Sequence, residues 1–190
     1  MFNKLTNTDL NIALIDSNLY GGISYNQEII TGNDFVYGVV CAASIKFTID
    51  NSADVVSTYL NNPLIWECQM AGETTYKRMG KFWIKDIQKN GKRATLTAYD
   101  AVSLLDKKAD DWFNNLTFPI SVPELVSSMA TKLGLAINFS STIPSLVSYK
   151  IENNAMIKNI TYRQLLEYIG QMWNCNFVGS PNEEYDIISL

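Results

Sequence analysis

Apolar and polar residues alternate along the first half of the chain, which is the pattern of half-buried β-strands. The alternation is strict over residues 44–49 and again over 64–70. Segments 51–54 and 61–63 are rich in Asn, Asp, Ser or Pro and have the composition of turns. Three further segments have strand character, namely 11–15, 25–30 and 35–41. About six or seven antiparallel strands without a long helix predict a small β-barrel or sandwich.

One hairpin is clear enough to predict its register, because a turn at Gly91 separates two strand-like segments, 80–88 and 92–99. A three-residue loop that ends at Gly91 would place Ile84 opposite Leu96. This register keeps the apolar residues of both strands on one face, and it puts the glycine in the left-handed conformation that such a loop needs. We therefore expect the three-residue loop.

The strand pattern ends near residue 100, and helical periodicity replaces it. Asp100 is a favourable N-cap, and apolar residues recur at helical spacing from 101 to 109. We therefore expect a helix over 101–109 and two domains, a β-barrel-like domain at 1–100 and an α+β domain at 101–190. The second domain also contains four short segments with strand character, 136–139, 147–151, 176–178 and 185–188.

The second half contains one helix pattern twice, at positions forty residues apart. Ser121 and Glu124 form a capping box in the first copy, and Thr161 and Gln164 repeat it in the second. Each copy has an apolar stripe and ends at a Gly or Asn suited to the left-handed conformation. Two copies are too few for a solenoid. We expect two similar helices packed on short strands, at 121–133 and 161–173.

The composition is that of a folded protein with little surface charge. Apolar residues make up 47% of the 190-residue chain and charged residues 18%. A surface poor in charge is what a subunit of an assembly would show, although monomers show it too. The net charge is −4, and the Lys and Arg residues are scattered singly or in pairs. Because no basic stripe is present, we expect no specific nucleic-acid binding.

The chain lacks the residues that several kinds of catalytic and metal-binding site require. It contains no histidine, which removes Ser–His and Cys–His nucleophile pairs and histidine-containing zinc sites. Its three cysteines, Cys41, Cys68 and Cys175, lack the close spacing of a thiolate metal site. We expect reduced, buried cysteines in a protein made in a cytoplasm. The sequence has no apolar signal-peptide core and no apolar run near ~18 residues, so we expect no membrane span.

Carboxylates remain the candidates for catalysis. A glycoside hydrolase needs two acids about 5–10 Å apart, and Asp110 and Asp111 lie next to Trp112. Nothing in the sequence forces a second acid close to this pair. We therefore interpret the pair as part of a solvated loop with an aromatic ring packed beneath it.

Three other groups have ordinary structural explanations. The acidic pair at 183–184 has the character of a solvated turn, and the glycine pair at 21–22 that of an isolated turn. Arg163 and Glu167 are spaced for an ion pair on a helix surface. We assign no catalytic, cofactor-binding or metal-binding residue and expect no cofactor.

The order of the elements and four local sequences together resemble a known family. The local sequences are 80–84 (GKFWI), 94–101 (ATLTAYDA), 116–119 (LTFP) and 161–169 (TYRQLLEYI). They look like the N-terminal part of the tail-tip hub proteins of siphophages and prophages. Those proteins are related to the central baseplate hub of contractile-tailed phages and to the hub part of type VI secretion spikes. The resemblance covers roughly residues 35–180 and rests on structural residues rather than on a functional motif.

The resemblance implies a structural component of a phage or prophage tail tip or baseplate hub, located in the virion tail and made in the cytoplasm of the bacterial host. Such a protein would form a ring of tail-tube-like β-barrel domains, expected to be a homotrimer, beneath the distal tail protein. The ring would link the tail tube to the host-facing tip and surround the channel for the tape-measure protein and DNA. Family members often run far longer, so we expect a truncated or shortened version without an enzymatic region.

Two alternatives stay open. A β-rich carbohydrate- or receptor-binding module would align exposed aromatic rings on one face, with Trp66, Trp83 and Trp112 as candidates. A carboxylate-dependent cell-wall hydrolase would use Asp110 or Asp111 with a distant second acid.

Overall fold

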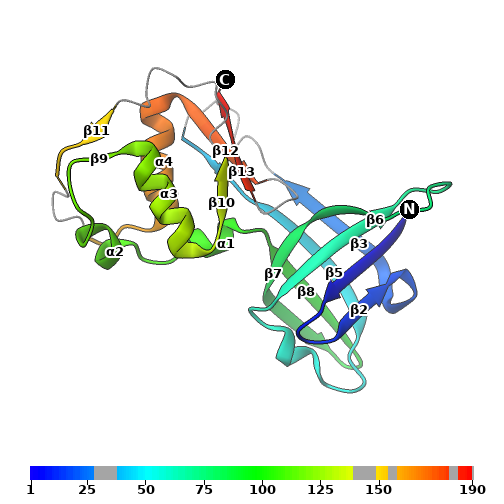
Figure 1. The fold of residues 1–190 in the computed structure, drawn as a ribbon. Helices are drawn as coiled ribbons and strands as arrows, with labels where there is room; N and C mark the ends of the chain where they lie inside the picture. Colours follow the sequence, from blue (N-terminus) through cyan, green and yellow to red (C-terminus); the bar gives the residue numbers. More distant parts are fainter. Residues whose placement is uncertain (28–37, 139–148, 154–157, 180–183, 190) are drawn as a thin grey trace, which may run out of the picture. The chain divides into compact units, whose positions relative to one another are not determined.

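The chain folds into two units, each built from two separate segments of the sequence (Figure 1). The computed structural model describes residues 1–27, 38–138, 149–153, 158–179 and 184–189. The first unit comprises Met1–Gln27 and Ala42–Ala101, and the second comprises Glu28–Cys41 and Val102–Leu190. The predicted division into 1–100 and 101–190 differs from this arrangement, because residues 28–41 belong to the second unit.

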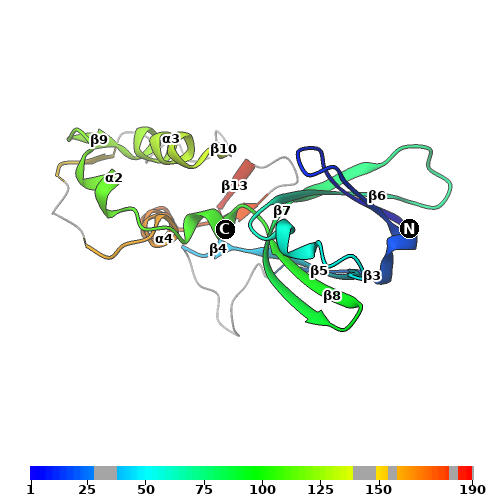
Figure 2. The same cartoon turned by 90° about the horizontal axis from the view of Figure 1, so that it is seen from below.

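The first unit is a curled antiparallel sheet of seven strands in the order β2-β1-β6-β7-β8-β5-β3. Figure 2 shows β6 on one side of its interior and β8, β5 and β3 on the other. Strand β7 connects the two sides, because its first half pairs with β6 and its second half with β8. Short 3-10 helices, η1 (Asp16–Asn18) and η2 (Val56–Tyr59), join some of the strands. The strands are β1 (Phe2–Asn7), β2 (Ile12–Ile15), β3 (Leu19–Gln27), β5 (Ala43–Asp50), β6 (Pro63–Gln69), β7 (Lys77–Asn90) and β8 (Arg93–Tyr99).

Strand alternation produces the core of this unit, as predicted. Ile45, Phe47 and Ile49 of β5 are buried, and the residues between them face outward. The partners of Ile45 and Phe47 on β8 are Ala98 and Leu96, which are buried as well. The remaining core residues are Ala43 of β5, Val56 of η2 and the inward-facing residues of the other strands, namely Leu5, Ile12, Leu19, Leu64, Trp66, Phe82, Ile84 and Ala94.

The predicted register of the β7–β8 hairpin is wrong. The strands are joined by a two-residue loop, Gly91 and Lys92, and Ile84 lies opposite Ala98 rather than Leu96. The glycine is left-handed as expected, with φ of 58°. A β-bulge directly after Ile84 adds one residue to β7. With the two-residue loop and uninterrupted pairing, the apolar residues of the two strands would not share one face along the whole hairpin. The extra residue in β7 shifts the register by one and brings them onto the same face.

The second unit contains a four-stranded sheet in the order β10-β13-β12-β4 and a two-stranded sheet, β11-β9. Helix α4 contacts β12 and β4, and α3 contacts β10, β9 and α4. The class is therefore α+β, as predicted. The elements are β4 (Val40–Cys41), α1 (Val102–Leu105), α2 (Asp110–Asn114), β9 (Ile120–Ser121), α3 (Val122–Leu133), β10 (Ala136–Asn138), β11 (Lys150–Ile151), α4 (Tyr162–Trp173), β12 (Cys175–Gly179) and β13 (Glu184–Ser189).

Helices α3 and α4 have the caps that the repeated pattern predicts. Ser121 and Thr161 each accept the backbone N–H of the third helical residue, and both capping boxes are complete. Gly134 and Asn174 end the helices with φ of 67° and 51°. The apolar stripes form a core face. Leu125, Val126 and Met129 on α3 and Leu165, Leu166, Ile169 and Trp173 on α4 are buried, whereas Leu133, at the end of the α3 stripe, is half-buried.

The helix predicted over 101–109 is wrong in extent, because α1 covers only Val102–Leu105. The Asp100 carboxylate accepts the backbone N–H of Ala43 at 2.8 Å and so joins β8 to β5. Lys108 then forms an isolated antiparallel bridge with Thr161. A residue that pairs in this way needs extended backbone, so the helix stops before it.

Two glycines, Gly38 and Gly170, let the segment before β4 approach α4 closely. The Gly38 N–H donates to the Cys175 carbonyl at 2.9 Å. A Cβ atom added to Gly170 would lie 2.7 Å from the Gly38 Cα. No side chain fits at this point of α4, which explains a glycine in the middle of an otherwise regular helix.

Candidate functional site

All three cysteines are buried, and the thiol of Cys175 is poorly suited to react. Cys41, Cys68 and Cys175 are free and buried, and burial raises the pKa of the Cys175 thiol from 9.0 to about 11. A thiol with this pKa stays protonated at neutral pH and is a poor nucleophile or metal ligand. Within the part of the chain that the structure describes, no cluster of three or more Cys, Asp or Glu residues could hold a metal ion.

Asp110 has a structural role that the sequence did not indicate. Its carboxylate accepts hydrogen bonds from the backbone N–H groups of Asn159 at 2.9 Å and Ile160 at 2.8 Å. It lies in the first turn of α2 rather than in the predicted solvated loop. The side chain therefore ties α2 to the segment that precedes α4. Asp111, the next residue, is exposed.

Asp111 borders a cleft that we call the α2 cleft. Its volume is about 510 Å³, within the range of about 300–1,000 Å³ that small-ligand sites occupy. Seven residues from α2, α3, α4 and the segments beside α2 line it, namely Lys108, Asp111, Trp112, Asn115, Leu116, Lys132 and Tyr162. Of these, the sequence predicted only Asp111 and Trp112 as candidates, since Lys132 and Tyr162 reach the cleft only through folding.

Backbone hydrogen bonds hold the segment before α2 against the start of α4. The Ala109 N–H donates to the Ile160 carbonyl at 2.9 Å, and the Tyr162 N–H donates to the Lys107 carbonyl at 3.2 Å. These bonds bring the rings of Trp112 and Tyr162 together, with centroids 5.2 Å apart and planes inclined by 48°. Burial raises the pKa of the Tyr162 phenol. The aromatic wall of the α2 cleft is thus built by main-chain pairing rather than by a mobile loop.

The cleft does not have the arrangement that a glycoside hydrolase needs. Two carboxyl groups about 5–10 Å apart are required, but Asp111 is the one acid among the lining residues. Asp110 is committed to two backbone N–H groups. The sequence hypothesis that uses either aspartate with a second acid gains no support from this geometry.

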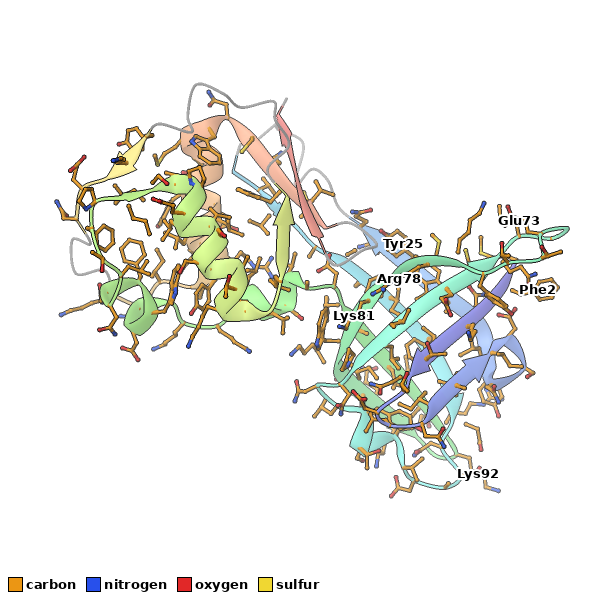
Figure 3. The ribbon with its side chains drawn as sticks, viewed as in Figure 1. Phe2, Tyr25, Glu73, Arg78, Lys81 and Lys92 are labelled. Carbon is orange, nitrogen blue, oxygen red and sulfur yellow. The ribbon has the colours of Figure 1, made fainter. Side chains whose placement is uncertain are left out.

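The tryptophans do not form the exposed row that a β-rich carbohydrate-binding module would present. Trp66 is only 5% exposed, because the Tyr25 ring of β3 (Figure 3) lies 5.5 Å from it and Phe82 lies 6.2 Å from it. Trp83 and Trp112 are half-buried. On the outer face of the sheet, Trp83 lies opposite Tyr99 in the register of β7 and β8.

The other groups singled out in the sequence are also structural. Arg163 binds Asp106 with two hydrogen bonds of 2.6 and 2.9 Å rather than pairing with Glu167. The pKa of Glu167 is raised, chiefly by burial. The glycine pair at 21–22 lies inside β3, at a register irregularity, and not in a turn. In the pair at 183–184, the first residue lies outside the described residues and the second belongs to β13.

None of the helices among the described residues is long and apolar enough to cross a membrane.

Cation–aromatic contacts occur on the first unit, where Lys81 lies 5.3 Å from the Trp83 ring and Arg93 lies 4.2 Å from the Tyr20 ring. These cations are therefore held on aromatic faces by contacts of modest strength.

No protein-family model and no curated protein matches the chain. Its fold is similar to that of the 43 kDa tail protein of prophage MuSo2 from Shewanella oneidensis, with a TM-score of 0.58 and 10% identity, over 98% of this chain and 54% of that chain. It is also similar to prophage tail protein gp18 from Listeria monocytogenes EGD-e, with a TM-score of 0.58 and 11% identity, over 98% of this chain and 50% of that chain. The chain thus spans about half the length of these proteins.

Proposed function

We propose that the chain is a non-enzymatic structural component of a phage or prophage tail, forming a ring in the tip or baseplate hub at the end of the tail tube. The observation that carries this proposal is the similarity of fold, over 98% of the chain, to two prophage tail proteins. The absence of histidine from the chain and the single acid in the α2 cleft are consistent with a role in assembly. The ring would link the tail tube to the host-facing tip.

The proposed ring is a homotrimer, with the distal tail protein, the tail tube and the tape-measure protein as its neighbours. Strands β2 and β3 end the seven-stranded sheet, so within the described residues each pairs along one edge only. β3 is nine residues long and contains neither a charged residue nor a proline, which are the usual devices that protect a free edge. An edge of this kind favours pairing with a strand of a neighbouring copy, and a head-to-tail contact of this type can close into a ring.

Size-exclusion chromatography with light scattering tests the ring. The expected mass is that of three chains. Ser24→Glu with Asn26→Lys places charges along the β3 edge, with the new glutamate next to Lys46 of β5, and should yield a monomer that keeps its fold. Gln88→Lys, at an exposed position on β7, is the matched control and should remain trimeric. A wild-type chain that stays monomeric at every concentration contradicts the homotrimeric ring.

The location in a tail needs a separate test. Antibodies raised against the chain should label one end of phage tails in electron micrographs of particles from the strain that carries the gene. Labelling of capsids, or of no particle at all, would refute a role at the tail tip.

A further inference from the structure

The α2 cleft holds an aromatic ring that is fixed but partly open. Trp112 is half-buried, and its ring lies 5.2 Å from that of Tyr162 and 6.3 Å from that of Phe113. Because both neighbours are buried, the indole is positioned before a ligand arrives, and binding costs little conformational entropy. The negative face of an indole attracts positively polarised C–H groups. The flat face of a sugar ring presents such groups.

Two lysines give the α2 cleft a positive local charge in a chain whose net charge is −4. Lys108 precedes α2 and Lys132 lies in the last turn of α3, and both are exposed. Among the residues that the structure describes, neither ammonium group pairs with a carboxylate. With Asp111 as the one acid in the lining, the cleft carries two positive charges and one negative charge. This balance favours a ligand with an acidic group.

Asp111 narrows the class of ligand further. Its side chain is exposed, and an ionised carboxylate can only accept hydrogen bonds. Asp111 would therefore repel a plain anion but could accept hydrogen bonds from a ligand that offers hydroxyl or amide donors. Asn115, one helical turn later, can both donate and accept. A ligand that satisfies the whole lining must combine an acidic group, several hydroxyl or amide donors and an apolar ring face.

We propose that the α2 cleft binds a sugar unit that carries an acidic substituent. The sugar ring lies against Trp112, its hydroxyl or amide donors bind Asp111 and Asn115, and its acidic group pairs with Lys108 and Lys132. This site belongs to the second unit and does not depend on the proposed ring.

Titration of the full ¹⁵N-labelled chain, followed by NMR at the Trp112 indole N–H, tests the proposal. N-acetylmuramic acid supplies a carboxylate and glucose 6-phosphate a phosphate, whereas N-acetylglucosamine is neutral and inorganic phosphate lacks the sugar. At least one acidic sugar should shift the Trp112 signal at lower concentration than the neutral sugar and inorganic phosphate. The acidic sugar that binds more tightly shows whether the cleft prefers a carboxylate or a phosphate.

Variants separate binding in the cleft from binding elsewhere. Lys108→Gln with Lys132→Gln should weaken the acidic sugar about tenfold, since each exposed charge pair contributes modestly, and should leave the neutral sugar unchanged. Lys107→Gln is the matched control, because that side chain is exposed but does not line the cleft. All three positions are on the surface, so the fold should be retained.

The proposal is overturned by any of three results. They are an unshifted Trp112 signal with both acidic sugars, equal affinity for inorganic phosphate or the neutral sugar, and full affinity in the double variant. Loss of binding in Lys107→Gln would equally overturn it. If the chain is a trimer but no acidic sugar shifts the Trp112 signal, the sugar site is rejected and the proposed ring is not. If the chain is a monomer but binds the acidic sugar, the ring is rejected and the sugar site is not.

Discussion

Replacing Gly170 by alanine tests the closest backbone approach in the second unit. The new Cβ would lie 2.7 Å from the Gly38 Cα, 2.9 Å from the Cys175 carbonyl oxygen and 3.2 Å from a ring carbon of Phe177. Two of these three atoms belong to the main chain and cannot move aside as a flexible side chain would. The substitution must therefore push Gly38 and β12 away from α4.

The magnitude follows from three opposing effects. Alanine favours the helix over glycine by about 1 kcal/mol. Overpacking a tight contact costs about 1–3 kcal/mol, and loss of the hydrogen bond from the Gly38 N–H to the Cys175 carbonyl costs about 1 kcal/mol more. The gain and the hydrogen-bond loss cancel, so Gly170→Ala should destabilise the unit by about 1–3 kcal/mol. For a chain of this length, each kcal/mol lowers Tm by about 2–4 °C.

Thermal unfolding followed by circular dichroism measures the loss, and hydrogen exchange locates it. Exchange should accelerate in α4 and in residues 38–41. Gly134→Ala is the control, because its Cβ would have no atom within 4 Å while its φ of 67° is strained for alanine. That control should cost about 1 kcal/mol and accelerate exchange only near the end of α3. A Gly170→Ala chain with unchanged or higher Tm would refute the close approach of Gly38.

Three further predictions concern caps, carboxylates and thiols. Ser121→Ala and Thr161→Ala should each cost about 1 kcal/mol in urea unfolding, because each removes an N-cap acceptor; a negligible cost at either position would contradict the repeated capping box. Asp110→Asn should cost about 2 kcal/mol, as expected for hydrogen bonds to a charged group, whereas Asp111→Asn should change stability by less than about 0.5 kcal/mol; equal costs would show that Asp110 does not tie α2 to α4. Because burial raises the pKa of Cys175 from 9.0 to about 11, its contribution to stability should be complete below pH 9 and be lost as pH rises toward 11. Cys175→Ala should flatten that alkaline decline in Tm, and an unchanged decline would assign it to other groups.

Several elements follow from local rules that the sequence contains in full. An N-cap and its partner lie three residues apart, as Ser121 and Glu124 do, so the start of α3 can be read directly. Alternation in β5 likewise specifies which residues of that strand are buried. Strand β1 was not predicted, because it lacks this alternation. Residues 2–7 show no clear apolar–polar pattern, and Leu5 is the only fully buried apolar residue of the strand.

The candidate site was predictable only in part. Asp111 and Trp112 are adjacent in the chain and drew attention as an acid beside an aromatic ring. Lys132 and Tyr162 are far from them in sequence and carry no local pattern that marks a site. Asp110 was interpreted as solvated, because nothing nearby in the chain indicates that its carboxylate would bind the backbone of Asn159.

The sequence by itself determined helices α3 and α4 with their caps, most strands and the absence of histidine chemistry, because each depends on residues within a few positions or on composition. Only the tertiary structure decided the bulge after Ile84, the assignment of residues 28–41 to the second unit, the contact of Gly38 with Gly170 and the lining of the α2 cleft. These features depend on which distant segments meet. That choice is made by burial and backbone hydrogen bonding over the whole unit, and no local pattern records it.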